Sequence, residues 1–183
     1  MAKVDFRIHD LDTAPEGARQ TLHQVRAKFG FVPNILGIMA ESPQALQAYV
    51  TLSALFDGTS LSDAERAVVL LTVSGANGCD YCVAAHTAGA RATKVSSEVI
   101  DAARSGKPIP DAKLEALRRL ASAVTETRGW PGDADVQAFL DAGYTRAQVL
   151  EVLVGVAMKT LSNYTNHLAE TPVDEPLKQH AAE

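Results

Sequence analysis

The apolar residues of this chain recur at helical spacing, and alternating runs of β-branched residues are almost absent. Steps of three and four residues place side chains on one face of a helix, whereas a half-buried strand needs strict alternation. The pattern is strongest in the stretch AERAVVLLTVSGA, residues 64–76, which is apolar nearly all round and therefore expected at the centre of the fold. The sequence predicts an all-α, single-domain multi-helix bundle.

Local capping signals indicate where several of these helices begin. A side-chain oxygen at the N-cap accepts a hydrogen bond from an unpaired backbone N–H, and a Glu or Gln three residues later can return the bond. The last helix is expected to extend to Ala169, before Pro172 forbids continuation. The capping signals are Ser42 with Pro43 behind it, the S-x-x-E box of Ser62 and Glu65, and the T-x-x-Q box of Thr145 and Gln148.

The 183 residues suffice for one domain with a proper core. We expect a single helical domain over residues 1–183 with its core at about residues 14–170. An arm from Val4 to Asp10 has a short alternation compatible with an extended strand, and the last dozen residues read as a polar C-terminal tail.

Charge and hydropathy exclude several classes of protein. The formal net charge of -5 offers no basic surface for a phosphate backbone, so no nucleic-acid partner is expected. No run of about 18 apolar residues is present, and the N-terminus lacks the apolar core of a secretory signal. We therefore expect no membrane partner and a cytoplasmic protein. In that compartment a close cysteine pair is more often catalytic or metal-binding than a structural crosslink.

Both cysteines lie in the motif NGCDYCVAAH, residues 77–86. Asn77 and Gly78 end the preceding helix, so that a new helix can begin close to Cys79. At about 100° per residue, Cys79, Cys82 and His86 then share one narrow face. The two cysteine Cα atoms are expected about 5 Å apart, within the range of a disulfide that can open and close.

The chemistry of such a pair depends on the thiolate, of which only about 3% is present at pH 7 for an unperturbed thiol. The helix N-terminus acts mainly on Cys79, whereas His86 lies one turn after Cys82 and can accept or return its proton. We predict Cys82 as the nucleophile, because an adjacent base both activates a thiol and protonates a leaving alkoxide. Cys79 is then the resolving thiol and His86 the proton carrier.

Two other interpretations of the motif stay open. A zinc site has only two sulfurs and one nitrogen here, and needs a fourth ligand such as His167 from the last helix. Alternatively, the cysteines are small core residues without chemistry. We expect neither a metal nor a bound cofactor, and no nucleotide fingerprint is present. His9, His23 and His180 are expected at the surface.

Three stretches together resemble the alkyl hydroperoxidase D-like (AhpD-like) proteins of the carboxymuconolactone decarboxylase superfamily, in a peroxidase-related branch. They are FGFVPNILGIMAESPQALQAYVTLSALF, LSDAERAVVLLTVSGANGCDYCVAAHT and VLVGVAMKTLSNYTNHLAETP. The resemblance implies an all-helical fold, assembly as a homo-oligomer (trimer, hexamer or dimer), and peroxidase activity on small hydroperoxides with an external lipoyl- or thioredoxin-type dithiol as electron donor. It also implies the roles already assigned to Cys82, Cys79 and His86.

One position departs from the pattern of the peroxidase itself. The resemblance implies a glutamate twelve positions before the first cysteine, where it tunes the histidine, but this chain has Ala67 there. Glu65 lies about 200° away on the helix and cannot replace it. We therefore expect a histidine without its orienting partner, and slow peroxidase turnover or a different dithiol reaction.

The function predicted from the sequence is that of a thiol-dependent peroxidase, an oxidoreductase that reduces hydroperoxides through the C-x-x-C-x-x-x-H site. The alternative is a redox or metal sensor without turnover. The polar stretch SNYTNH in the last helix is expected to frame a pocket, contact a neighbouring subunit or form a solvated helix end. Its polar residues are Asn163, Tyr164, Asn166 and His167. Tyr81 is expected to point away from the dithiol and to pack against another helix or subunit.

Overall fold

The structure, a computed structural model, describes residues 5–181. Within that range the chain forms nine α-helices, one short 3-10 helix and no strand, which confirms the predicted all-α class. Residues 5–10 have no regular secondary structure, and Val4, where the predicted arm begins, lies outside the described residues. The helices are α1 (Glu16–Phe29), α2 (Asn34–Met39), α3 (Pro43–Asp57), α4 (Asp63–Ala76), α5 (Asp80–Ala92), α6 (Ser97–Ser105), α7 (Ala112–Glu126), α8 (Asp133–Asp141), α9 (Arg146–Ala169) and the 3-10 helix η1 (Glu175–His180).

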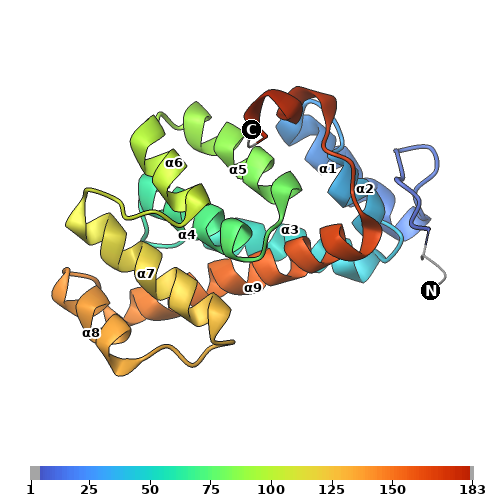
Figure 1. The fold of residues 1–183 in the computed structure, drawn as a ribbon. Helices are drawn as coiled ribbons and strands as arrows, with labels where there is room; N and C mark the ends of the chain where they lie inside the picture. Colours follow the sequence, from blue (N-terminus) through green and yellow to red (C-terminus); the bar gives the residue numbers. More distant parts are fainter. Residues whose placement is uncertain (1–4, 182–183) are drawn as a thin grey trace.

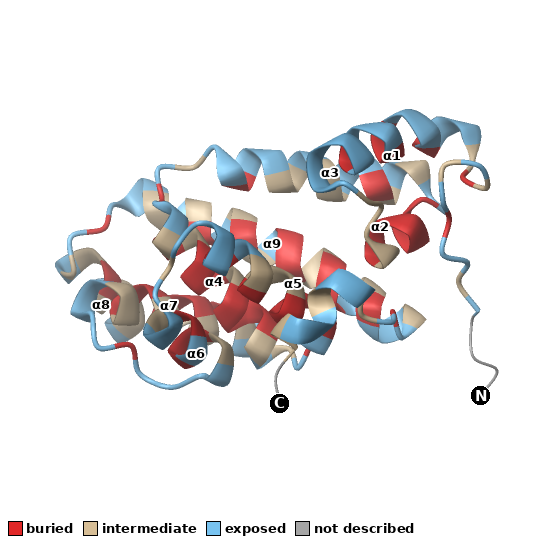
Figure 2. Cartoon of the chain, turned by 90° about the horizontal axis from the view of Figure 1, so that it is seen from above, coloured by how far each residue is buried: buried red, intermediate tan, exposed pale blue. Residues whose placement is uncertain are grey.

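Helix α4 lies at the centre of the bundle and packs against α5, α6, α7 and α9 (Figure 1). Its Val68, Val69 and Leu71 are completely buried, as expected for a helix that is apolar nearly all round. Figure 2 shows buried residues concentrated along α4 and on the faces that neighbouring helices turn toward it. The chain segment before the cysteine motif is therefore rigidly held from several sides.

The predicted capping signals form as expected. The Ser62 side chain accepts a hydrogen bond from the Glu65 backbone N–H, and Glu65 Oε2 accepts one from the Ser62 backbone N–H at 2.7 Å. Thr145 and Gln148 form the same reciprocal box at the start of α9. Ser42 caps α3 with Pro43 in the first turn.

The turn between α4 and α5 positions the cysteine motif. Gly78 has φ of +64°, a left-handed conformation that glycine adopts without steric cost. The chain therefore reverses in two residues, and Cys79 becomes the N-cap of α5. Cys82 and His86 follow on the first two turns of that helix.

The C-terminal segment differs from the predicted polar tail, because part of it packs on the protein. Helix η1 lies against α5, and the segment runs alongside the cysteine helix in Figure 1. Just before it, Asp174 is only 6% exposed and accepts hydrogen bonds from the Tyr81 hydroxyl and from the Asn34 backbone N–H. Tyr81 therefore packs within its own chain, one of the two options that the sequence left open. The tail's contacts depend on residues more than 90 positions away, which local sequence patterns do not reveal.

The outer side of α9 carries large exposed apolar residues: Leu150, Leu153, Tyr164 and Leu168. Assembly as a homo-oligomer remains a prediction. Within residues 5–181 no helix has the length and apolar character needed to cross a membrane.

The inner side of α9 approaches α3 and α4 closely at Gly155. A Cβ atom built there would lie 2.7 Å from Phe56 Cε2 and 2.8 Å from Val69 Cγ1, both in the packed core. No side chain fits without movement of these groups. The absence of a side chain at Gly155 therefore allows α9 to reach its position beside α4 and α5.

We expect Gly155→Ala to lower the free energy of unfolding by about 1–3 kcal/mol, because the added methyl group overpacks the core. Urea titration followed by circular dichroism measures this change. Gly89→Ala is the matched control, since Gly89 lies in α5 with open space around its Cα, and there we expect a gain of about 0.5–1 kcal/mol from helix propensity. Equal effects at both positions would show that α9 is not held this closely.

Candidate active site

The two cysteines lie side by side as free thiols, 3.4 Å apart. Both are buried, Cys79 at 2% and Cys82 at 3% exposure. On one side they belong to an apolar cluster with residues of α1, α2 and α3. An apolar surrounding alone disfavours a thiolate, so the polar contacts on the other side decide the chemistry.

Those polar contacts come from the inner face of α9. Asn166 Nδ2 lies 3.2 Å from Cys82 Sγ and 3.6 Å from Cys79 Sγ, within donor range of both sulfurs. Ser162 Oγ lies 3.8 Å from Cys82 Sγ. Asn163 accepts a hydrogen bond of 2.8 Å from Asn77, which ties α9 to the turn before the motif. The dithiol is therefore enclosed between an apolar cluster and a polar stripe.

The pKa values of the two thiols are shifted in opposite directions. The Cys79 thiol donates to Cys82, and this bond, opposed by burial, lowers the pKa of Cys82 well below its ordinary value, with further help from the Lys159 charge and from Ser162. The same bond, together with burial, raises the pKa of Cys79. The arrangement therefore favours a thiolate on Cys82 and a protonated thiol on Cys79.

His86 makes a 2.7 Å contact through Nε2 with the Lys159 ammonium, whose side chain is completely buried. An ammonium group has donors only, so Nε2 must be the acceptor and the neutral ring carries its proton on Nδ1. Burial and the nearby Lys159 charge lower the pKa of His86 well below its ordinary value, which agrees with a neutral ring. His86 is thus oriented and kept uncharged by Lys159.

This contact corrects the expectation that the histidine lacks an orienting partner. Ala67 has no polar group to offer, and Glu65 is engaged in capping Ser62 and in an ion pair of 3.2 Å with Lys113. Lys159, from a helix far away in the sequence, binds the imidazole instead. The partner of His86 is therefore a cation rather than a carboxylate.

The polar stretch of the last helix divides between the interior and the surface. Asn163 and Asn166 are buried, Asn163 at Asn77 and Asn166 at the dithiol, whereas Tyr164 is 55% exposed and His167 is also exposed. Lys159 and Ser162 were not predicted from the sequence. Both lie on the same face as Val152, Gly155 and Asn166, at steps of three, four or seven residues. A lone lysine on an otherwise apolar face was the available signal.

The alternative of a zinc site with His167 as fourth ligand is not supported. His167 is exposed and lies beside Tyr164, with the ring centroids 6.3 Å apart. Among residues 5–181 no group of three or more His, Cys, Asp or Glu side chains is arranged to hold a metal ion. One histidine prediction was wrong: His9 is 7% exposed and its Nε2 lies 2.7 Å from Glu41.

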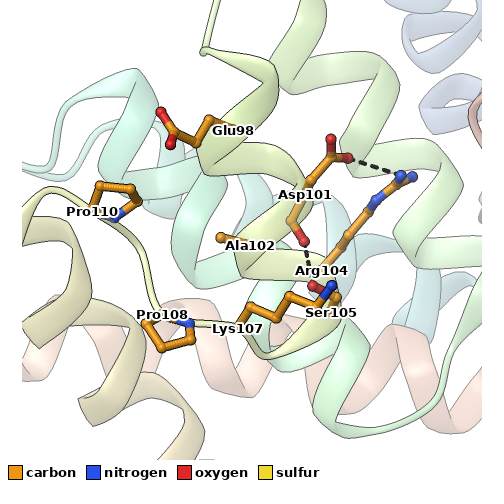
Figure 3. A pocket seen from close by; sticks show the side chains of 8 residues that line it. All are labelled: Glu98, Asp101, Ala102, Arg104, Ser105, Lys107, Pro108 and Pro110. Atoms are coloured by element: carbon orange, nitrogen blue, oxygen red, sulfur yellow. Dashed lines mark hydrogen bonds and ion pairs between the residues drawn. The ribbon is translucent and has the colours of Figure 1, made fainter.

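Two surface clefts lie near this region. One, beside α6, is lined by an Asp101–Arg104 ion pair and by Pro108 and Pro110 (Figure 3). It contains neither a cysteine nor a histidine and offers no nucleophile. The second cleft includes Cys79 among its lining residues, together with Arg91 and Arg104. Of the two thiols, Cys79 is therefore the one that lies next to this cleft.

Residues 41–107, which include the cysteine motif, match the family model described as "Carboxymuconolactone decarboxylase family". No curated protein matches the sequence significantly.

Several solved structures share the fold over almost the whole chain. An uncharacterized peroxidase-related protein with an alkylhydroperoxidase AhpD core, from Ralstonia eutropha JMP134, is 23% identical, with a TM-score of 0.79 over 97% of this chain and 95% of its own. A peroxidase-related protein from Silicibacter sp. TM1040 is 20% identical, with a TM-score of 0.80 over 95% and 92%. A cysteine-to-alanine variant of the debrominase Bmp8 in complex with 2,3,4-tribromopyrrole is 16% identical, with a TM-score of 0.81 over 98% and 96%. These structures confirm the predicted AhpD-like, all-helical fold, and the family match covers residues 41–107.

The asymmetry of the thiols predicts a single thiolate in the reduced protein. Because the pKa of Cys82 is lowered, we expect its thiolate to form well below pH 9.0 and to be lost as the pH falls through that lowered value, whereas the raised pKa of Cys79 keeps this thiol protonated above pH 9.0. Ultraviolet thiolate absorbance as a function of pH measures both. We expect one titration well below pH 9.0, absent in Cys82→Ser and present in Cys79→Ser. Two thiols titrating together near pH 9.0 would contradict the assignment.

Proposed function

We propose that this chain, with its AhpD-like fold and its carboxymuconolactone decarboxylase segment, is a thiol-dependent peroxidase that reduces hydroperoxides at the expense of an external dithiol. The Cys82 thiolate attacks the terminal peroxide oxygen, the O–O bond breaks, and the alcohol leaves with a proton carried by His86. Cys82 becomes a sulfenic acid. Its sulfur then forms a disulfide with Cys79, and water is released.

The observation that carries this proposal is the pairing of a buried, stabilised Cys82 with a protonated thiol 3.4 Å away. A nucleophile of this kind needs a thiolate at neutral pH, and a sulfenic acid needs a nearby thiol to resolve it. A structural cysteine needs neither. A thiolate buried in the core for packing alone would lower the stability of the fold, because burial disfavours its charge.

Two unpaired polar atoms, one on Asn166 beside the thiols and one on Asn163 beside Asn77, support the binding of a small oxygen-bearing substrate. Asn163 Nδ2 and Asn166 Oδ1 are buried and have no hydrogen-bond partner within residues 5–181. Buried polar atoms are rarely left in this state. We propose that they bind the peroxide or its alcohol product.

Regeneration of the thiols needs a donor that reaches the disulfide. The donor thiolate attacks the Cys79 sulfur, so that Cys82, the thiol of lower pKa, is the leaving group. The cleft that Cys79 lines supports approach from this side. A lipoyl- or thioredoxin-type dithiol then takes the disulfide electrons and completes the cycle.

We expect the reduced protein to consume an organic hydroperoxide with the loss of two thiols per chain, and to turn over repeatedly when a dithiol such as dihydrolipoamide is supplied. Cys82→Ser should abolish alcohol formation. Cys79→Ser should still form one sulfenic acid, trapped by dimedone, but no disulfide. Stopped-flow thiol titration and mass spectrometry measure these outcomes.

An unchanged rate of alcohol formation in Cys82→Ser would overturn the proposal. A single oxidation that no dithiol reverses would favour the alternative of a redox sensor without turnover. Because a debrominase shares this fold, 2,3,4-tribromopyrrole serves as the comparison electrophile. If Cys82 reacts faster with this compound than with hydroperoxides, the proposed substrate would no longer be a peroxide.

A further inference from the structure

We propose that Lys159 is both the counter-charge of the Cys82 thiolate and the proton source for the leaving alkoxide, which it serves through His86. The inference rests on the proposed function. Lys159 is a positioning and proton-supplying residue that acts through the imidazole, and neither the sequence motif nor the family match assigns it a role. Its ammonium group has no exposure to solvent and contacts His86 at 2.7 Å.

A lysine is rarely buried completely unless its charge is paired. Within residues 5–181 Lys159 forms no ion pair with a carboxylate. Its positive charge acts instead on Cys82 and on neutral His86. The negative charge of the Cys82 thiolate and the positive charge of the Lys159 ammonium therefore compensate each other.

Other titratable groups surround the pair, and the Asp174 carboxylate lies behind one of them, at the Tyr81 hydroxyl. From α5 and its N-cap these are Tyr81, His86 and Cys79, and from α3 the group is Tyr49. Burial, with a further contribution from the Cys82 charge, raises the pKa of Tyr49. Burial and the hydrogen bond to Asp174 raise the pKa of Tyr81. Lys159 supplies a positive charge that lowers the pKa of Cys82.

The geometry also gives a path for the proton. The His86 ring receives a hydrogen bond from Lys159 at Nε2 and carries its own proton on Nδ1. When Nδ1 gives that proton to the departing alkoxide, the ammonium replaces it at Nε2, and the ring returns to a neutral state. The proton thus comes from Lys159, while His86 transmits it.

Protons and charge balance over the whole catalytic cycle. The reduced site holds one proton on Cys79 and one extra on Lys159. The alkoxide takes the Lys159 proton, the resolving step releases water with the Cys79 proton, and the site is left as a disulfide beside a neutral amine. The two protons of the external dithiol then restore the Cys79 thiol and the Lys159 ammonium, and the dithiol leaves as a disulfide. Both oxidation and reduction therefore proceed without a net change of charge in the buried site.

The counter-charge role and the proton-source role of Lys159 can be separated by the choice of peroxide. An alkyl hydroperoxide releases an alkoxide, which needs a proton to leave, whereas a peroxycarboxylic acid releases a carboxylate, which does not. Loss of the thiolate slows both substrates equally. Loss of the proton source slows the alkyl hydroperoxide alone.

The experiment compares the wild type with Lys159→Met, Lys159→Arg and, as a matched control for charge removal, Lys107→Met, since Lys107 is exposed on the loop after α6. Two quantities are measured in single turnover: the pH at which the Cys82 thiolate titrates, and the rates with cumene hydroperoxide and peracetic acid at a pH where Cys82 is fully ionised.

We expect Lys159→Met to move the Cys82 titration to higher pH, and each rise of one pH unit in its midpoint lowers the thiolate fraction at low pH about tenfold. At full ionisation the variant should lose roughly 100-fold with cumene hydroperoxide and much less with peracetic acid. Lys159→Arg keeps a charge that cannot be released, so it should retain the low Cys82 titration but lose the cumene hydroperoxide rate. Lys107→Met should match the wild type.

An unchanged Cys82 titration in Lys159→Met overturns the counter-charge role, and equal losses with both peroxides overturn the proton role. If Lys159→Met does not fold, Lys159→Arg alone decides the proton role: an undiminished cumene hydroperoxide rate refutes it. None of these results depends on the outcome for Cys82→Ser. A failure of this inference is therefore distinguishable from a failure of the proposed peroxidase.

Discussion

A buried positive charge beside a buried thiol is the interaction on which the site depends. Neither group is stable alone in this position, because a charge without a partner in a protein interior costs several kcal/mol. Lys159 and the Cys82 thiolate compensate each other, and Asn166 donates a further hydrogen bond to the Cys82 sulfur. The contact also fixes the tautomer of His86. Lys159, which the C-x-x-C-x-x-x-H motif does not contain, therefore helps to set the protonation of Cys82 and His86, while the bond between the two thiols separates Cys82 from Cys79.

The two cysteines differ because they lie at different points of one helix start. Cys79 is the N-cap of α5 and points its thiol proton at Cys82, which lies one turn further along and faces α9. The helix N-terminus would favour a thiolate at Cys79, yet burial and the donated hydrogen bond keep that thiol protonated. Short-range contacts thus outweigh the helix dipole. In the proposed cycle each cysteine therefore keeps one role in both half-reactions, since the thiol of lower pKa is the better nucleophile at neutral pH and the better leaving group.

The sequence predicted the features that depend on neighbours along the chain. The capping boxes at Ser62 and Thr145, the glycine reversal at Gly78 and the apolar α4 all follow from spacing and from residue type. The predicted roles of the cysteines and His86 also rest on spacing within one turn or two, and they remain predictions. What spacing could not give is the pairing of residues far apart, such as Lys159 with His86 or Asp174 with Tyr81. These contacts depend on which helix lies beside α5, and that is decided by packing, for example by the close approach of α9 at Gly155.

The replacement of a carboxylate by a cation at the histidine changes where the proton is stored. A carboxylate beside an imidazole stabilises the charged ring, so the histidine itself would hold the proton to be delivered. With Ala67 in the carboxylate position and Lys159 on Nε2, the charged ring is disfavoured and the ammonium holds the proton instead. The same ammonium stabilises the thiolate, a task that a carboxylate would oppose. A single buried lysine from α9 therefore combines two functions that a carboxylate and a helix dipole would otherwise have to divide, and the peroxide reduction proposed here does not require the missing glutamate.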